Sequence, residues 1–295
     1  MSSWYQNEDE EQVFDPTASL RLVNQLFAKE TMETMINKDF YAMEFNISCR
    51  TRSNVFVPIE VGIVKFSIKD GIKDSYHDFI HPGRVPLGYA ATAKDLYLNY
   101  HGIPVHGFTV KNYNLFLENS QKSSRADDTE DYHTAIKEAI KRIDEFVKPD
   151  VVYREAERGR PGLDVRPVFS YPTEEAGVVQ TDGCLRRLAS EAKNLSFYEG
   201  FQVMDVVHMV KFACRLKSES ADRAYAIFKD NFNKKILLPP ADECCEYHKD
   251  IGTFNCARNL AYTVAYCFLD FVCPNYPVKI TPAHLPPPIG EPEFW

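Results

Sequence analysis

Val55-Phe-Val-Pro-Ile-Glu-Val-Gly-Ile-Val-Lys-Phe-Ser67 is the stretch that decides how this chain of 295 residues folds. Its content of Val, Ile and Phe is typical of a β-strand. The turn Lys69-Asp70-Gly71 ends it, and the next strand, about Ser75–Ile80, stops at His81-Pro-Gly83. An apolar segment that opens at Asp39 supplies the strand before it. Three consecutive strands joined by short turns predict an antiparallel meander.

Strands and helices alternate in the rest of the chain. Ile136, Ile140, Ile143 and Phe146 recur at helical spacing, which predicts an amphipathic helix over Thr134–Val147. Similar spacing predicts helices over about 17–36, 91–100, 180–193, 205–216 and 254–270. Strands are predicted at Val151–Tyr153 and Val165–Tyr171. Loops are predicted over 119–133 and over 84–107, which includes the helix at 91–100. This order predicts an α/β fold with a mixed sheet flanked by helices, as in a ribonuclease-H-like fold.

Composition and charge exclude several classes of protein. Apolar residues make up 44% of the chain, which is enough for a buried core. The net charge of −8 argues against bulk electrostatic binding to nucleic acid, although a local basic face is compatible with it. No stretch approaches the ~18 uninterrupted apolar residues of a membrane span. The acidic N-terminus is unlike a signal peptide, so we expect an intracellular protein whose eight cysteines stay reduced or bind metal.

Three regions are expected along the chain. Residues 1–36 form an acidic tail and a helix, and residues 37–275 form the main domain. Residues 276–295 are rich in proline, which predicts an extended tail.

Three potential metal ligands lie close together near the C-terminus. Cys245-Glu-Tyr-His248 places a thiol and an imidazole three residues apart, and Cys256 follows after a short loop. Zinc favours such mixtures of sulfur and nitrogen, but a closed structural site needs a fourth ligand. No further His or Cys sits at conventional spacing nearby, so the missing ligand would come from elsewhere in the fold. Buried thiols without a metal are the alternative interpretation.

Several ordered motifs resemble those of the Maelstrom domain family. They are Val57-Pro-Ile-Glu-Val-Gly-Ile-Val-Lys-Phe-Ser-Ile-Lys-Asp-Gly-Ile72, His81-Pro-Gly-Arg-Val-Pro-Leu-Gly-Tyr89, His101-Gly-Ile-Pro104 and the closing Cys245-x₂-His248…Cys256-Ala257. The resemblance covers residues 38–275. It implies a fold similar to that of the DEDD-type 3′–5′ exonucleases and a role in the piRNA pathway of animal germ cells. It does not include the HMG box that many members carry, so no DNA-bending module is expected.

The resemblance also implies a complete ligand set. The family's Glu-Cys-His-Cys set falls on Glu60, Cys245, His248 and Cys256. Cys244 is an adjacent alternative to Cys245, but the C-x₂-H spacing favours Cys245. Four protein ligands leave no open position for a reacting water, so the expected Zn²⁺ is a structural staple between the meander and the C-terminal helices. A role for Glu60 at a sheet edge or in a salt bridge is the alternative.

The acids of a two-metal exonuclease are missing from their expected positions. Such enzymes hold two metal ions with about four carboxylates. The first strand offers Glu44-Phe-Asn46, with one carboxylate lost, and no acid follows the strand that ends at Tyr171. Asp205 and Asp250 are the nearest replacements, and we interpret both as helix-cap or solvated residues. A two-metal mechanism is therefore not expected.

The resemblance implies a second possibility, which is cleavage of single-stranded RNA without these acids. Catalysis would then need another acid and base, and two apposed histidines perform such transesterification. The candidates in and near the predicted loop over 84–107 are His77, His81, His101 and His106. The alternative is that these are ordinary loop histidines at turns.

Basic residues gather in three segments and suggest an RNA-binding face. They are Arg154, Arg158, Arg160 and Arg166 around one loop, Arg186 and Arg187 on one predicted helix, and Lys211, Arg215 and Lys217 on another. Tyr153 and Tyr171 are close enough in sequence to stack bases. Glu155, Glu157 and Asp164 dilute the first group, so an ordinary solvated surface is the alternative.

Together with the resemblance, these observations lead us to expect a zinc-stabilised, degenerate nuclease fold that binds single-stranded RNA. The resemblance implies that it assembles with piRNA-pathway proteins and supports transposon silencing in the germline, in cytoplasmic perinuclear germ granules and in the nucleus. Two alternatives stay open. One is an active, metal-independent endoribonuclease specific for single strands, and the other is a protein-interaction scaffold without RNA affinity.

Overall fold

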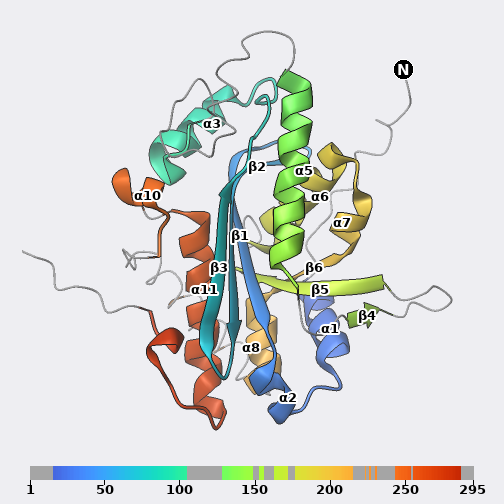
Figure 1. Ribbon diagram of the computed structural model, residues 1–295, viewed down its shortest axis with the longest axis vertical. Helices are drawn as coiled ribbons and strands as arrows, with labels where there is room; N and C mark the ends of the chain where they lie inside the picture. The colour runs from blue at the N-terminus through green and yellow to red at the C-terminus, as the bar shows by residue number, and fades with distance from the viewer. Residues whose placement is uncertain are drawn as a thin grey trace, which may run out of the picture.

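The architecture is a single mixed sheet with helices on both sides (Figure 1). A computed structural model describes residues 16–104, 128–148, 153–155, 163–171, 177–214, 243–253 and 255–286, with the single positions 223, 226 and 230. The predicted acidic tail over 1–15 and the end of the proline-rich tail over 287–295 lie outside the described residues. None of the described helices is both long and apolar enough to cross a membrane.

The predicted meander forms the first half of the sheet. β1 (Phe40–Arg50) pairs antiparallel with β2 (Phe56–Ser67), which pairs antiparallel with β3 (Gly71–Phe79). β1 and β2 are buried along almost their whole length, as their Val-, Ile- and Phe-rich sequences require. The meander is confirmed, and β3 begins directly at the predicted turn, a few residues earlier than expected.

Strands from the second half of the chain extend the sheet beyond β1. β5 (Leu163–Ser170) pairs parallel with β1, β6 (Phe201–Asp205) pairs parallel with β5, and β4 (Tyr153–Glu155) pairs antiparallel with β5. The strand order is β3-β2-β1-β5-β4, with β6 also on β5. An antiparallel meander continued by parallel strands confirms the predicted ribonuclease-H-like α/β fold with a mixed sheet.

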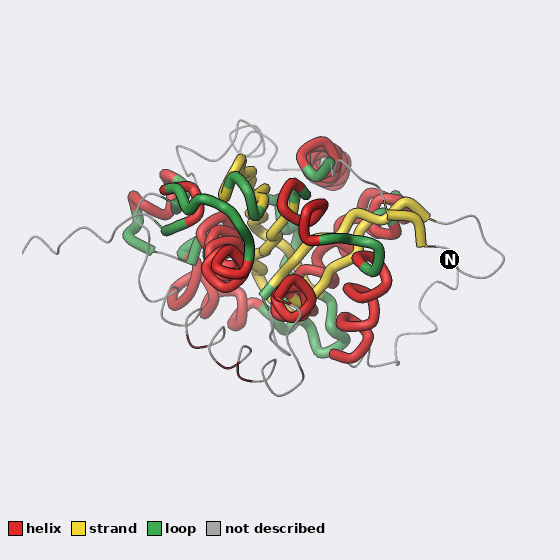
Figure 2. The backbone as a smooth tube through the Cα atoms, turned by 90° about the horizontal axis from the view of Figure 1, so that it is seen from below, coloured by secondary structure: helices red, strands yellow, loops and turns green. Residues whose placement is uncertain are grey.

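Two groups of helices cover the two faces of the sheet (Figure 2). On one face α1, α8 and α11 pack against Phe40, Ala42 and Phe66, and on the other face α5 and α6 pack against Met43 and Phe45. The bounds are α1 Pro16–Phe27, α2 Met32–Asn37, α3 Ala90–Leu96 with a π-helix over Tyr97–His101, α5 Asp128–Phe146, α6 Val178–Ala192, α7 Leu195–Glu199, α8 Val206–Cys214, α10 Glu246–Asp250 and α11 Ala257–Val272.

Several elements differ from the sequence predictions, and the short helices α7 and α10 are absent from them. The helix expected over 17–36 is two helices, because Thr31 caps α2: its hydroxyl accepts from Thr34 N at 3.2 Å and the Thr34 hydroxyl accepts from Thr31 N at 2.9 Å. The loop expected over 119–133 ends earlier, because α5 already begins at Asp128. β6 is absent from the predictions, because its short apolar run continues into α8 without a break and short runs do not separate strand from helix.

Both ends of the described chain pack against the central domain. Phe27 of α1 lies in the same core cluster as β1. At the other end Tyr276 and His284 are buried, and His284 Nε2 lies 3.1 Å from the carbonyl oxygen of Ile68. Residues 276–285 therefore pack against the end of the β2–β3 hairpin.

Candidate metal centre

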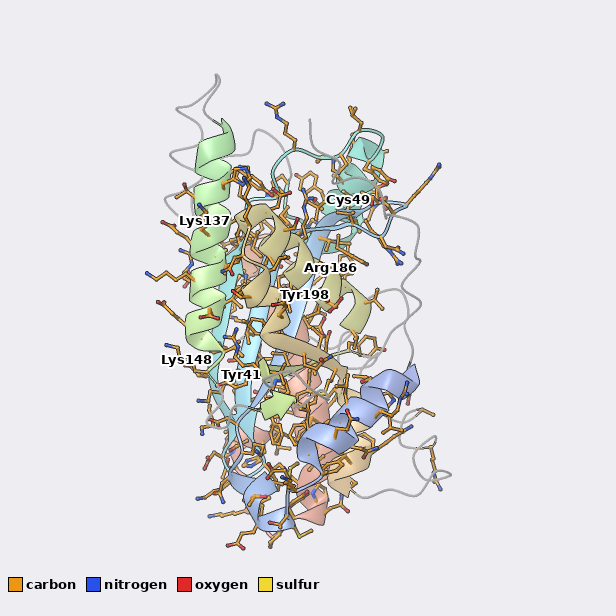
Figure 3. All side chains as sticks on the ribbon, turned by 90° about the vertical axis from the view of Figure 1, so that its right-hand side faces the viewer. Tyr41, Cys49, Lys137, Lys148, Arg186 and Tyr198 are labelled. Carbon is orange, nitrogen blue, oxygen red and sulfur yellow. The ribbon has the colours of Figure 1, made fainter. Side chains whose placement is uncertain are left out.

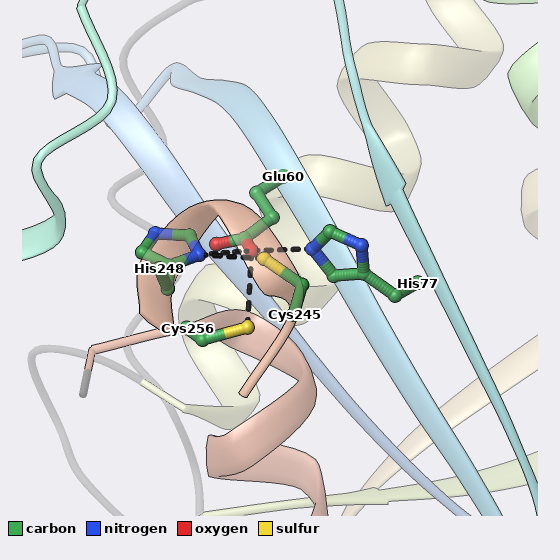
Figure 4. Close-up of side chains that lie close together, drawn as sticks. All are labelled: Glu60, His77, Cys245, His248 and Cys256. Atoms are coloured by element: carbon green, nitrogen blue, oxygen red, sulfur yellow. Dashed lines mark hydrogen bonds and ion pairs between the residues drawn. The ribbon is translucent and has the colours of Figure 1, made fainter. Parts of the chain in front are cut away.

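Five potential metal ligands from separate segments meet in one buried cluster (Figure 4). Glu60 comes from β2 and His77 from β3. Cys245 is the residue before α10, His248 lies within α10, and Cys256 is the residue before α11. Their ligand atoms all lie within 4.8 Å of one another. The structure thus brings the four residues of the predicted set together and adds His77 to them.

Glu60 Oε1 lies at the centre of the contacts. His77 Nε2 is 2.6 Å from it, Cys256 Sγ is 3.3 Å away and His248 Nδ1 is 3.4 Å away. Cys245 Sγ lies 2.9 Å from His248 Nδ1. Glu60, His248 and Cys256 are fully buried and Cys245 is 7% exposed, so the cluster is largely closed to water.

The hydrogen bonds of His248 prepare it to bind a metal. Its Nε2 lies 2.9 Å from the carbonyl oxygen of His101, which only accepts, so Nε2 carries a hydrogen and Nδ1 faces the cluster, where it can bind an ion once it is unprotonated. Metal-binding histidines commonly donate their second N–H to a carbonyl in this way. His101 is fixed in turn, because its Nδ1 accepts from Ile103 N at 2.9 Å and its Nε2 lies 3.2 Å from Ile47 O.

Burial and crowding perturb the protonation of the whole cluster. Burial acts to lower the pKa of His77, but its hydrogen bonds with Cys256 and Glu60 outweigh burial and raise the pKa to about 10. Burial and the nearby Cys256 raise the pKa of Glu60. Burial would raise the pKa of the Cys256 thiol, yet hydrogen bonds from Cys244, Cys245 and the two histidines lower it instead. Without an ion, these groups have to share a few protons in a dry space.

The donor set fits zinc. Two thiols, two imidazoles and a carboxylate are the ligand types that zinc binds, and a bound ion would take the place of the shared protons. Four of the five donors suffice for a tetrahedral site, so no position stays open for a reacting water. An ion held here would cross-link the sheet to the C-terminal helices. Cys244 is not one of the five donors, and its thiol lies 3.9 Å from Thr253 O.

His77 is the candidate ligand that the sequence interpretation missed. It lies in β3, within the strand predicted at about Ser75–Ile80, but we considered it only among the candidate catalytic histidines and not as a ligand. The register pairs His77 with Gly62, and Glu60 is two residues from Gly62, so Glu60 and His77 share one face of the sheet. Counting outward from the turn at Lys69-Asp70-Gly71 would pair Gly62 with Tyr76. A register shift between Lys65 and Phe66 brings His77 opposite Gly62 instead, so the turn alone does not place His77 beside Glu60.

At the positions where an exonuclease carries its first acids, β1 has one carboxylate. Glu44 is buried, and its Oε1 accepts hydrogen bonds from Ser170 Oγ and Tyr171 N, both at 2.8 Å. Asp205 caps α8 as predicted, because its Oδ1 accepts from Val207 N at 2.7 Å. Across the part of the chain that the structure describes, no second group of three or more potential ligands gathers.

The other candidate histidines have structural roles of their own. His77 belongs to the metal cluster, and His101 is fixed by two backbone groups. His81 Nδ1 accepts from Gly83 N at 3.0 Å. His106 lies outside the described residues. These engagements argue against the histidine acid–base pair of the alternative interpretation.

Arg166 is part of the fold and not of an open RNA-binding surface. Its guanidinium pairs with the Asp144 carboxylate at 2.7 Å, donates to the carbonyl of Val147 at 3.3 Å and lies over the Phe201 ring at 4.1 Å. It also donates to Gly200 O at 3.3 Å. The residue therefore joins α5 to β5 and to the turn before β6.

The remaining predicted RNA contacts are dispersed. Arg186 and Arg187 make ion pairs with acids one turn away on α6 (Figure 3 labels Arg186), and Lys211 lies in the last turn of α8. Arg158, Arg160, Arg215 and the side chain of Arg154 lie outside the described residues. The described members of the predicted set do not by themselves define one face.

Fold and cluster together define a class of protein. It is a ribonuclease-H-like α/β domain that keeps a single carboxylate on its first strand and has a buried Glu, His and Cys cluster between its sheet and its C-terminal helices. A family model described as "Maelstrom: piRNA pathway germ-plasm component" matches residues 50–290. The chain belongs to the Maelstrom family.

Curated relatives agree with this membership. A protein maelstrom homolog from Xenopus tropicalis is 26% identical over 239 residues, which cover 79% of this chain and 47% of that protein. Protein maelstrom 1 from Drosophila persimilis is 25% identical over 271 residues, which cover 88% of this chain and 54% of that protein. A homolog from Mus musculus is 22% identical over 231 residues, which cover 78% of this chain and 44% of that protein. The chain thus spans about half the length of these relatives.

Proposed function

We propose that this chain acts in the piRNA pathway by binding single-stranded RNA on the surface of a zinc-stabilised, degenerate nuclease fold. Membership of a family described as a piRNA-pathway component supports the pathway. In this proposal the protein assembles with other piRNA-pathway proteins in cytoplasmic germ granules and the nucleus, and it supports transposon silencing in germ cells. A buried metal cluster with no open ligand position leaves the surface as the place where a partner binds.

The observation that carries RNA binding is a groove of about 480 Å³ between α5 and the segment 192–197. Lys137 and Lys141 line one wall, and Phe197 contributes an apolar part of the lining. Asp144 is the acidic residue among the lining side chains. Its carboxylate already pairs with the guanidinium of Arg166 at 2.7 Å. The groove therefore offers cations to a ligand without a competing free carboxylate in its lining.

The lysines are available for phosphate groups. Lys137 has no ion-pair partner within the described residues, and Lys141 makes one long contact of 4.0 Å with exposed Glu145. Lys148, two residues beyond the C-terminal end of α5, is a further exposed cation (Figure 3). An RNA backbone along this groove would gain counterion release, which is the main source of sequence-independent affinity.

Reversing two charges tests this proposal. We expect the double variant Lys137→Glu/Lys141→Glu to bind a fluorescein-labelled single-stranded RNA at least about tenfold more weakly, measured by fluorescence anisotropy. The slope of log affinity against log salt should fall by about 1 to 2, because up to two phosphate contacts are lost. The matched control is Lys69→Glu/Lys279→Glu, which changes the net charge equally at the β2–β3 turn and in the C-terminal segment.

The outcomes separate the alternatives. If the control pair weakened binding as much as the groove pair, the affinity would be bulk electrostatics and the groove would not be the site. If the wild type bound no RNA at any salt concentration, the scaffold alternative would replace RNA binding. If the wild type cut the RNA and a single substitution abolished cutting, the endoribonuclease alternative would hold.

A further inference from the structure

Asn46 is the closest neighbour of Glu60 across the β1–β2 ladder. The two residues are register partners, and Asn46 is only 1% exposed. Its Nδ2 donates one hydrogen to Glu60 Oε2 at 2.6 Å and the other to the carbonyl oxygen of Asn255 at 2.5 Å. Both partners only accept, so the amide nitrogen and not the amide oxygen has to face them.

The two oxygens of Glu60 therefore have different tasks. Oε2 accepts from Asn46 Nδ2 and from Ala257 N, the first N–H of α11, at 3.0 Å. Oε1 faces His77, His248 and Cys256. The carboxylate cannot rotate about its last bond without breaking both hydrogen bonds to Oε2.

The amide keeps this orientation at a local cost. Within the described residues Asn46 Oδ1 is buried and has no hydrogen-bond partner. A buried acceptor without a partner is unfavourable, so packing alone would favour a smaller or apolar side chain here. The amide nitrogen explains why an asparagine occupies this position. Its Nδ2 holds the ligand Glu60 in place and, through Asn255 O, also holds the backbone directly before the ligand Cys256.

We propose that Asn46 is the positioning residue of the metal centre. Its amide engages Oε2, so that Glu60 presents Oε1 alone to the ion, and it sets the approach of the Cys256 segment. The inference rests on the proposed binding of zinc by the cluster. It assigns a role to the position at which the first strand lacks the second acid of an exonuclease.

Two substitutions at one position test the proposal. Asn46→Asp keeps the shape but places a carboxylate oxygen against Glu60 Oε2, and Asn46→Ala removes the donor. We expect Asn46→Asp to bind Zn²⁺ about 10- to 100-fold more weakly in competition with a chromophoric chelator, and Asn46→Ala to be intermediate. Absorption of the Co²⁺-loaded proteins should change in the ligand-field region, which a purely structural role would not cause.

The controls make each outcome decisive. Ser48→Ala removes another buried polar side chain of β1, which lies 3.4 Å from Val57 O, and should leave Zn²⁺ affinity unchanged. Wild-type affinity in Asn46→Asp, within a factor of two, would overturn the positioning role alone. A wild type that binds no zinc would overturn the zinc site itself. If Asn46→Asp does not fold, unchanged zinc affinity in Asn46→Ala overturns the role and weakened affinity supports it.

Discussion

Glu44 is a buried acid that has no ion-pair partner among the described residues. Its side chain is 4% exposed, and burial raises its pKa from 4.5 to about 7 despite hydrogen bonds from Tyr171 N and Ser170 Oγ. A carboxyl with a raised pKa holds its proton more tightly in the folded than in the unfolded state. Its contribution to stability is therefore present below pH 4.5 and is lost as the pH rises from 4.5 to about 7.

Glu44→Gln should remove this loss. The glutamine Oε1 still accepts from Ser170 and Tyr171, but the side chain carries no charge at any pH. We expect the variant to exceed the wild type in free energy of unfolding by roughly 3 kcal/mol at pH 8, with the difference shrinking toward zero near pH 4. Urea unfolding across this pH range measures it. A difference that stays constant with pH would mean that the pKa of Glu44 is the same in the folded and unfolded states.

Individual site residues differ in how far the sequence predicts them. Cys245, His248 and Cys256 are recognisable because their spacing is local. Glu60 depends on the family resemblance, because no local pattern links residues so far apart. His77 additionally needs the register of β2 and β3, and the shift between Lys65 and Phe66 makes that register different from the one counted from the turn.

At the scale of elements, the contact between α11 and β2 brings the cluster together. Gly62 lies two residues after Glu60 on the same face, and a Cβ atom there would overlap the backbone of Ala257 and Arg258. The missing side chain lets the start of α11 reach the strand. That approach allows Ala257 N to donate to Glu60 Oε2 and places Cys256 beside the carboxylate.

Gly62→Ala should therefore disturb folding and metal binding together. The methyl group meets backbone atoms that cannot move aside alone, so we expect a loss of about 3 kcal/mol in the free energy of unfolding. Bound zinc per chain should fall as well, because Cys256 moves with α11. Gly88→Ala is the control, since no heavy atom lies within 4 Å and only its φ of +88° adds about 1 kcal/mol of strain. Equal losses in the two variants would contradict the role of close packing.

Helices and strands could be predicted where the sequence clearly marks their ends or their periodicity. Turn residues separate β2 from β3, and helical periodicity marks α5, so both were identified. β6 and the break between α1 and α2 carry no such signal, because an apolar run crosses one boundary and a threonine cap replaces glycine or proline at the other. Their identity comes from tertiary pairing with β5 and from the local capping box.

Over the whole molecule, the cluster joins the first half of the sheet to the last helices. Glu60 and His77 lie in the meander, whereas Cys245, His248 and Cys256 lie beside α10 and α11. A metal that binds only when these segments meet stabilises the folded state by mass action. Other contacts between the same regions remain without it, because α11 also packs on β1 and β2 through the core.

Zinc removal should consequently weaken the fold. We expect about one zinc per chain by metal analysis. Chelation should lower the free energy of unfolding by about 4 kcal/mol, compared with protein in free zinc at ~1,000 times the dissociation constant. His248→Ala should resemble the chelated wild type and respond little to chelator. His284→Ala is the matched control: it removes another buried histidine, whose Nε2 lies 3.1 Å from Ile68 O, and should lose stability while keeping its zinc and its response to chelator. A metal-free wild type with unchanged stability would show that hydrogen bonds alone hold the cluster.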